Sequence, residues 1–176
     1  NPEEYLELSP VDARIEAQEI VDTQMRHEIY TRCGDPWNDN FQSMKNIVRA
    51  YNSMSQVVDM VPSGKYTRIM CIRPDCVYRM PFNVGWLNTN AVIVPDFHHW
   101  GGVNDRFLCG PEKPMRTLMK RYNYWKEMHE TGQFKTCPNG EYFLKYILRR
   151  KGITYVLVKF IFSRMRADGR ICPLDA

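Results

Sequence analysis

The stretch from residue 65 to residue 110 constrains the fold most, because short apolar runs alternate there with clusters of polar residues. Three of these runs have the composition of strands, and they cover residues 66–72, 91–94 and 106–109. Short buried strands that stop at polar side chains are typical of open α/β sheets, which place their ligand sites at strand ends. We therefore expect a sheet in this stretch and a site at its edge.

Helices are expected on both sides of this stretch. Apolar residues at helical spacing predict helices over residues 12–31, 38–61, 112–130 and 138–150, with Asp12 as the first N-cap. Residues 153–162 are rich in β-branched and aromatic side chains and predict a last strand. This alternation predicts one α/β domain over residues 1–176, with a central mixed β-sheet flanked by helices.

The composition is ordinary for a soluble globular protein, and no apolar run approaches the ~18 residues that a membrane span needs. The acidic, polar start has no signal-peptide pattern. Six scattered cysteines predict reduced thiols and a cytoplasmic protein. The first residue is not Met, so we also expect that the chain is processed or is a piece of a longer one.

Three motifs follow one another in the chain. Residues 66–75 form a strand-like run that ends in Arg-Pro-Asp, and residues 101–110 read GGVNDRFLCG. Residues 137–144 read CPNGEYFL, and a strand that opens with GITY follows. Over roughly residues 40–160, the chain resembles the catalytic domains of GT-A-type glycosyltransferases, including small ones encoded by large DNA viruses of algae.

The resemblance implies an enzyme that moves a sugar from a nucleotide diphosphate sugar to a hydroxyl of a glycan acceptor, often with Mn²⁺ or Mg²⁺. If the chain is viral, the expected location becomes the host cytoplasm. The metal in such enzymes usually sits on an Asp-x-Asp motif, and Arg73-Pro74-Asp75 offers one carboxylate in its place. GT-A domains also begin with a βαβ unit that holds the nucleotide, and none is evident before residue 40.

Glycosyl transfer needs a neutralised diphosphate and often a carboxylate base for the acceptor hydroxyl. The resemblance assigns the catalytic role to Asp105, within N-D-R-F, and the metal to Asp75, whose hard oxygen ligands suit Mg²⁺ and Mn²⁺. Arg73 is a candidate phosphate contact, or a structural partner of an acidic residue. Asn104 and Glu141 are further candidates for binding the substrate, and Glu141 lies at an expected helix start.

The loop after the second strand supplies the remaining candidates. His98 or His99 could ligate Mn²⁺ or donate to a diphosphate, but adjacent side chains diverge, so we expect at most one in the site. Trp100 could form a platform for a sugar, with Gly101 and Gly102 as a hinge. The alternative for these residues is packing and turn formation.

Three other functions remain open from the sequence. Cys71, Cys76 and Cys109 with a histidine could hold zinc, although their spacing is loose. Residues 111–176 carry fourteen Lys and Arg against six Asp and Glu, which permits a nucleic-acid-binding module. The aromatic residues within 121–126 mostly continue a helical core stripe, so we do not expect a nucleic-acid partner. The third alternative is a non-catalytic fragment of a transferase.

Overall fold

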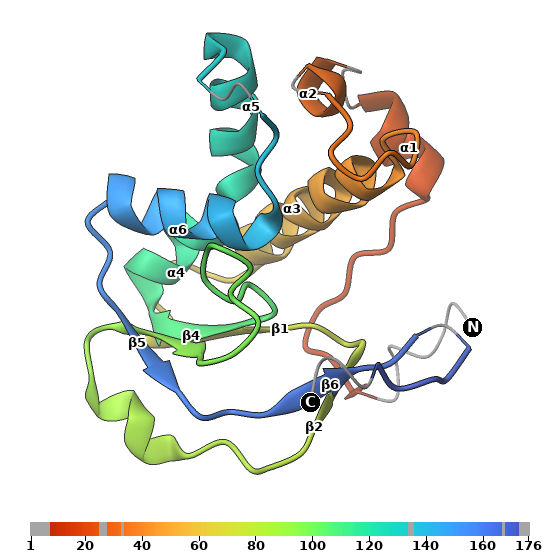
Figure 1. Cartoon of the computed structure of the whole chain (residues 1–176). Coiled ribbons are helices and arrows are strands. Elements are labelled where there is room, and N and C mark those ends of the chain that lie inside the picture. The colour runs from red at the N-terminus through yellow and green to blue at the C-terminus, as the bar shows by residue number, and fades with distance from the viewer. Residues whose placement is uncertain (1–7, 25–27, 33, 134–135, 167, 173–176) are drawn as a thin grey trace.

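The computed structural model describes residues 8–24, 28–32, 34–133, 136–166 and 168–172. Its central sheet has the strand order β1-β4-β3-β5, with bounds Arg68–Ile72 for β1, Phe107–Pro111 for β4, Val92–Pro95 for β3 and Tyr155–Val158 for β5. Strand β4 is antiparallel to both of its neighbours, and β3 is parallel to β5. The expected α/β class with a mixed sheet is confirmed (Figure 1).

The main helices cover one face of this sheet (Figure 1). They are α3 (Gln42–Met60), α4 (Glu112–Met119), α5 (Arg121–Thr131) and α6 (Gly140–Arg150), and the shorter α1 (Gln18–Gln24) and α2 (Glu28–Thr31) precede them. Asn139 caps α6, because its side chain accepts a hydrogen bond from the backbone N–H of Tyr142 at 2.8 Å. Among the described residues before Met60, the structure has helices and no strand.

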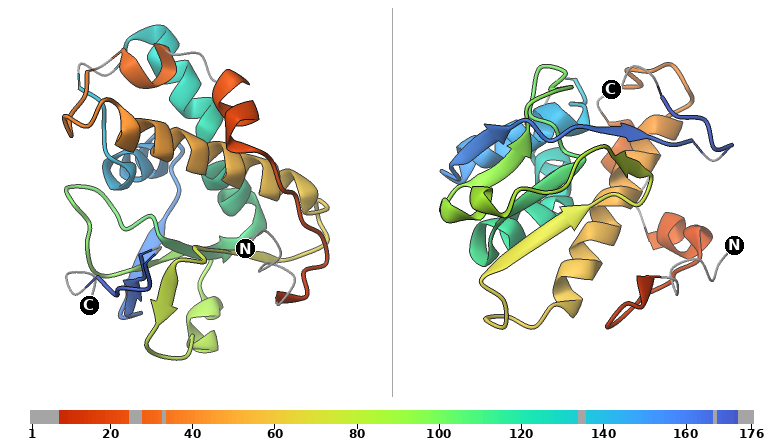
Figure 2. Two further views of the ribbon diagram at one scale, coloured as in Figure 1. Left: turned by 90° about the vertical axis from the view of Figure 1, so that its right-hand side faces the viewer. Right: turned by 90° about the horizontal axis from the view of Figure 1, so that it is seen from below.

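Alternating side chains of the strands enter two separate cores. Val92 and Val94 pack under the helices, whereas Ile93 packs on the opposite face with Phe107 and Phe160. This second face is covered by a two-stranded sheet of β2 (Cys76–Tyr78) and β6 (Phe162–Arg164), and by a 3₁₀ turn at Val84–Asn88 (Figure 2). The two inner strands, β3 and β4, are therefore buried on both sides, whereas the edge strands β1 and β5 stay partly exposed.

Three expected elements differ from the structure. The first helix begins at Gln18, and Asp12 instead accepts a hydrogen bond from Ala13; the exposed residues before Gln18 lack the packing that a short helix needs. The helix expected over residues 112–130 divides at Lys120, so that α4 packs on the sheet and α5 packs on α3. The last expected strand divides into β5 and β6, because Phe160 turns into the second core.

The expectation that all cysteines are reduced thiols is wrong at Cys137. Cys137 is disulfide-bonded, whereas Cys71, Cys76, Cys109 and Cys172 are free thiols. Disulfides are rare in cytosolic proteins, so the cysteines no longer favour the cytoplasm. The remaining cysteine, at position 33, lies outside the described residues. No helix in the described part of the chain combines the length and apolar composition that a bilayer crossing requires.

Candidate functional site

The pairing of β1 with β4 brings two of the sequence motifs together. Ile72, the last residue of β1, lies opposite Phe107, the first residue of β4. Residues 73–75 and residues 105–106 continue from these two strand ends, so they emerge at the same edge of the sheet. Two of the three polar clusters expected at strand ends therefore lie at this edge, whereas Asp96, His98 and His99 lie in the loop between β3 and β4.

A tight turn follows β1, with a hydrogen bond at 3.3 Å from the backbone N–H of Cys76 to the carbonyl of Arg73. Pro74 occupies the second position of this turn, where its fixed φ fits. The Arg73 guanidinium donates to both carboxylate oxygens of Asp75, at 2.9 and 2.6 Å. Partial burial opposes the charge of Asp75, but the paired Arg73 outweighs it and lowers the pKa of the carboxyl.

A cavity of about 580 Å³ opens between α3 and the end of β1. Its polar lining includes Tyr51, Arg73, Asp75, Asp105 and Arg106. Much of the remaining wall is apolar and includes Ile47, Ala50, Met54, Val57, Cys71, Ile72, Pro74 and Met119. A hollow with apolar walls and a few converging polar groups is the usual form of a small-molecule site.

A buried arginine, Arg121, contacts the cavity-lining Asp105 from the protein interior. Arg121 is fully buried, and its Nη1 lies 3.6 Å from Oδ2 of Asp105. Its Nε donates to the carbonyl of Leu118 at 3.1 Å, and its guanidinium lies over the ring of Tyr51 at 5.3 Å. Asp105, whose side chain is 18% exposed, is thus held between a buried cation and the cavity.

Helix α6 brings a second carboxylate to this cluster. Oε1 of Glu141 lies 3.6 Å from Nη2 of Arg106, and both side chains are largely buried. Burial, together with the nearby charge of Asp105, raises the pKa of Glu141. The preceding residue is Gly140, where a Cβ would lie only 2.5 Å from Oδ2 of Asp105. A glycine at this position therefore lets the Asp105 carboxylate approach α6.

The loop between β3 and β4 is held by its own side chains. The ring of His99 lies 3.2 Å from both Asp96 Oδ1 and the backbone N–H of Asn104. Asn104 is fully buried; its amide donates to the carbonyl of Phe97 at 2.9 Å and accepts from the N–H of Arg106 at 3.0 Å. Asn104 therefore shapes the loop before Asp105, and its side-chain amide is already engaged there.

The loop also docks on α6, away from the cavity. Gly102 lies so close to α6 that a Cβ would be 1.9 Å from the carbonyl carbon of Glu141. Trp100 is 61% exposed, and His98 packs against its ring at 5.7 Å. Gly101 accepts from Lys145 Nζ at 3.3 Å. Within the described structure, the cavity lining includes no residue of the 98–102 segment, so a role for it in binding stays a prediction.

The structure thus brings together Arg73, Asp75 and Asp105 in the cavity wall, with Glu141 behind them. Tyr51 and Arg121 join the cluster, although neither was expected there. Tyr51 belongs to the apolar stripe of α3, which is a core signal, and Arg121 begins a basic stretch that looks exposed in the sequence.

The side chains at this site do not fit the expected Mn²⁺ or Mg²⁺ well. Both oxygens of Asp75 already accept hydrogen bonds from Arg73. Among the residues that the structure describes, no group of three His, Cys, Asp or Glu is placed to hold a metal ion. The same observation leaves the zinc alternative without support.

The nucleic-acid alternative also loses its main residues, because Arg121 and Trp125 are fully buried in the core. Bases could not stack on a tryptophan in that position. Comparison of the chain with family models and with curated proteins found no match.

Proposed function

We propose that the chain is a glycosyltransferase of GT-A type, which moves a sugar from a nucleotide diphosphate sugar to a hydroxyl of a glycan acceptor. One observation carries this proposal. The R-P-D and N-D-R-F motifs lie about 30 residues apart in the sequence, yet both line a single cavity between α3 and the sheet edge. The apolar wall suits a sugar or nucleoside face, and the polar rim suits hydroxyl and phosphate groups.

Asp105 is the proposed base of the reaction. It would accept the proton of the acceptor hydroxyl as that oxygen forms its bond to the anomeric carbon of the sugar. The bond from that carbon to the diphosphate breaks, and the diphosphate leaves with the electron pair. Arg121 keeps Asp105 in place, since its buried guanidinium lies 3.6 Å from the carboxylate.

Calorimetric titration with UDP, GDP and their sugars, with and without Mn²⁺, tests this proposal. We expect one nucleotide sugar to bind to the wild type. Ala50→Trp should abolish that binding, because Ala50 lies on the exposed side of α3 and lines the cavity. Gln42→Trp is the matched control, at an exposed position of α3 outside the lining. Absence of binding for every nucleotide sugar would contradict the proposal and favour a non-catalytic fragment.

A further inference from the structure

Several donor groups around the cavity have no acceptor. In the described part of the chain, Nη1 of Arg106, both Nη atoms of Arg121 and the hydroxyl of Tyr51 are buried without a hydrogen-bond partner. Arg106 is 7% exposed, Tyr51 1% and Arg121 0%. Buried polar groups in proteins are nearly always satisfied, and an unsatisfied cluster points to an absent ligand or water. Arg106 and Tyr51 both line the cavity, so a ligand bound there lies against them.

The groups that lack partners are donors, which indicates the charge of the ligand. Guanidinium groups carry only donors, and a phenol can donate as well. Burial raises the pKa of Tyr51, so its hydroxyl keeps its proton. Asp75 already accepts two hydrogen bonds from Arg73. Asp105 and Glu141 form ion pairs with Arg121 and Arg106 at 3.6 Å, a distance that leaves the guanidinium donors without a hydrogen bond. The missing partner is therefore an acceptor with several oxygens.

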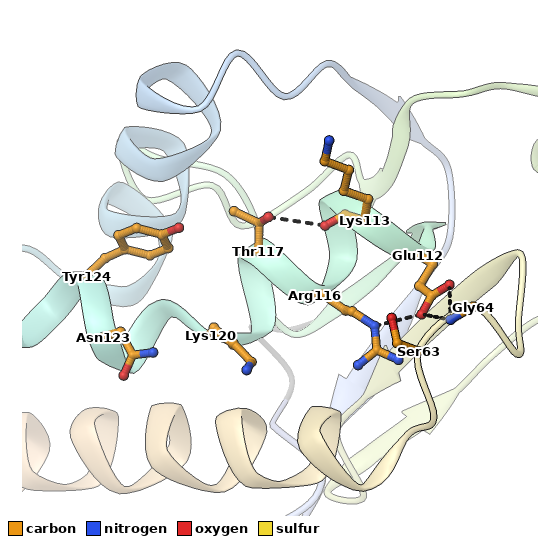
Figure 3. A pocket seen from close by; sticks show the side chains of 9 residues that line it. All are labelled: Ser63, Gly64, Glu112, Lys113, Arg116, Thr117, Lys120, Asn123 and Tyr124. Carbon is orange, nitrogen blue, oxygen red and sulfur yellow. Dashed lines mark hydrogen bonds and ion pairs between the residues drawn. The ribbon is translucent and has the colours of Figure 1, made fainter.

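A second large hollow in the described structure is basic, but two of its basic side chains, Arg116 and Lys120, have acceptors within the protein (Figure 3). It measures about 610 Å³ and is lined by Lys113, Arg116 and Lys120 among others. Arg116 donates to Glu112 at 2.7 Å, to the carbonyl of Val58 in the last turn of α3 at 2.8 Å, and to the carbonyl of Val61, just after α3, at 2.7 Å. Lys120 pairs with Asp59 at 2.6 Å. Arg116 and Lys120 thus connect the α4 side of this hollow to the C-terminal end of α3.

We propose that Arg106 and the Tyr51 hydroxyl, with the buried Arg121 adding positive charge next to them, form an oxyanion site that holds the diphosphate of the donor without a divalent ion. Fixed guanidinium donors can offset the charge of a leaving diphosphate, as a metal ion does in other sites. The identity of the ligand rests on the proposed function, whereas the oxyanion site itself does not. The proposal also accounts for the poor fit of these side chains to Mn²⁺ or Mg²⁺.

Titration with inorganic pyrophosphate tests the site directly, in buffer freed of divalent ions by a chelating resin and at fixed ionic strength. We expect the wild type to bind. Arg106→Gln should weaken binding by about 10–100-fold, the range for a lost hydrogen bond to a charged group. Tyr51→Phe should weaken it by about 3–10-fold. Lys113→Gln, in the basic hollow, should leave the affinity unchanged.

Tyr51→Phe keeps the test interpretable if Arg106→Gln does not fold. It removes only a hydroxyl that has no hydrogen-bond partner in the structure, so its urea midpoint should not fall. Equal pyrophosphate affinity of this variant and the wild type would overturn the proposal. Binding that requires Mn²⁺, or that weakens in Lys113→Gln instead, would also overturn it.

The result separates this inference from the proposed function. If metal-free pyrophosphate binds at Arg106 and no nucleotide sugar binds, the oxyanion site stands and the glycosyltransferase proposal fails. If a nucleotide sugar binds only with Mn²⁺ and with equal affinity in Arg106→Gln, the oxyanion site fails and the glycosyltransferase proposal stands.

Discussion

Substituting alanine for Gly102 should destabilise the fold sharply, because the loop that leads to Asp105 packs directly on α6. The new Cβ would lie 1.9 Å from the carbonyl carbon of Glu141, whereas real Cβ contacts start near 3.0 Å, so the loop must move by about 1.1 Å (3.0 − 1.9). This movement breaks the hydrogen bond from the N–H of Val103 to the carbonyl of Glu141, now 3.0 Å long. Overpacking costs ~1–3 kcal/mol and the lost bond ~1 kcal/mol, which gives a loss of ~2–4 kcal/mol.

Gly101→Ala is the matched control for this substitution. No atom lies within 4 Å of its added Cβ, but its φ of +80° strains any residue except glycine. That strain costs ~1–2 kcal/mol. Urea unfolding measures both free energies of unfolding, and we expect Gly102→Ala to be the less stable variant, by about 1.5 kcal/mol between the middle values of the two ranges. Equal stabilities, or the opposite order, would refute the docking of this loop on α6.

Two further substitutions probe the carboxylates. In Gly140→Ala, the new Cβ clashes with the Asp105 carboxylate at 2.5 Å and lies at ordinary contact distance, 3.5 Å, from the Tyr51 hydroxyl. The carboxylate should therefore shift, stability should change little, and kcat for sugar transfer should fall by about 10–100-fold; an unchanged kcat would contradict this. Burial raises the pKa of Glu141 above its ordinary 4.5, so its stabilising contribution is complete below that value and is lost as the pH rises through the folded-state pKa. The free energy of unfolding of Glu141→Gln, relative to wild type, should therefore increase as the pH rises above 4.5; a constant difference in urea titrations would contradict this.

The sequence predicted polar residues and a site at the ends of buried strands, and Arg73 and Asp105 are among those residues. It did not predict which ends meet, because Arg73 follows β1 and Asp105 precedes β4, and only the antiparallel pairing of the two strands brings them to one edge. It also predicted α3, whose stripe includes Val48, Tyr51 and Val58, all of them buried. The position of Tyr51 in the cavity lining could not be predicted from this stripe. Apolar spacing does not distinguish a side chain that faces only the core from one that also lines a cavity.

Arg121 and the 98–102 loop could not be placed from the sequence. Arg121 is buried because the helix divides at Lys120 and turns toward α3. No glycine or proline marks this break in the sequence. The course of the loop depends on its contact with the carbonyl of Glu141, about 40 residues later in the chain. Long-range packing of this kind leaves no local pattern.

The central claim is that Asp105 performs sugar transfer at the cavity, and turnover of the Asp105→Asn variant tests it most directly. Release of nucleoside diphosphate from the bound donor would be followed in the wild type and the variant, with calorimetry confirming that both bind the donor. We predict that turnover falls at least about 100-fold, as the loss of a general base typically causes. Near-wild-type turnover by a variant that binds the donor would contradict the claim.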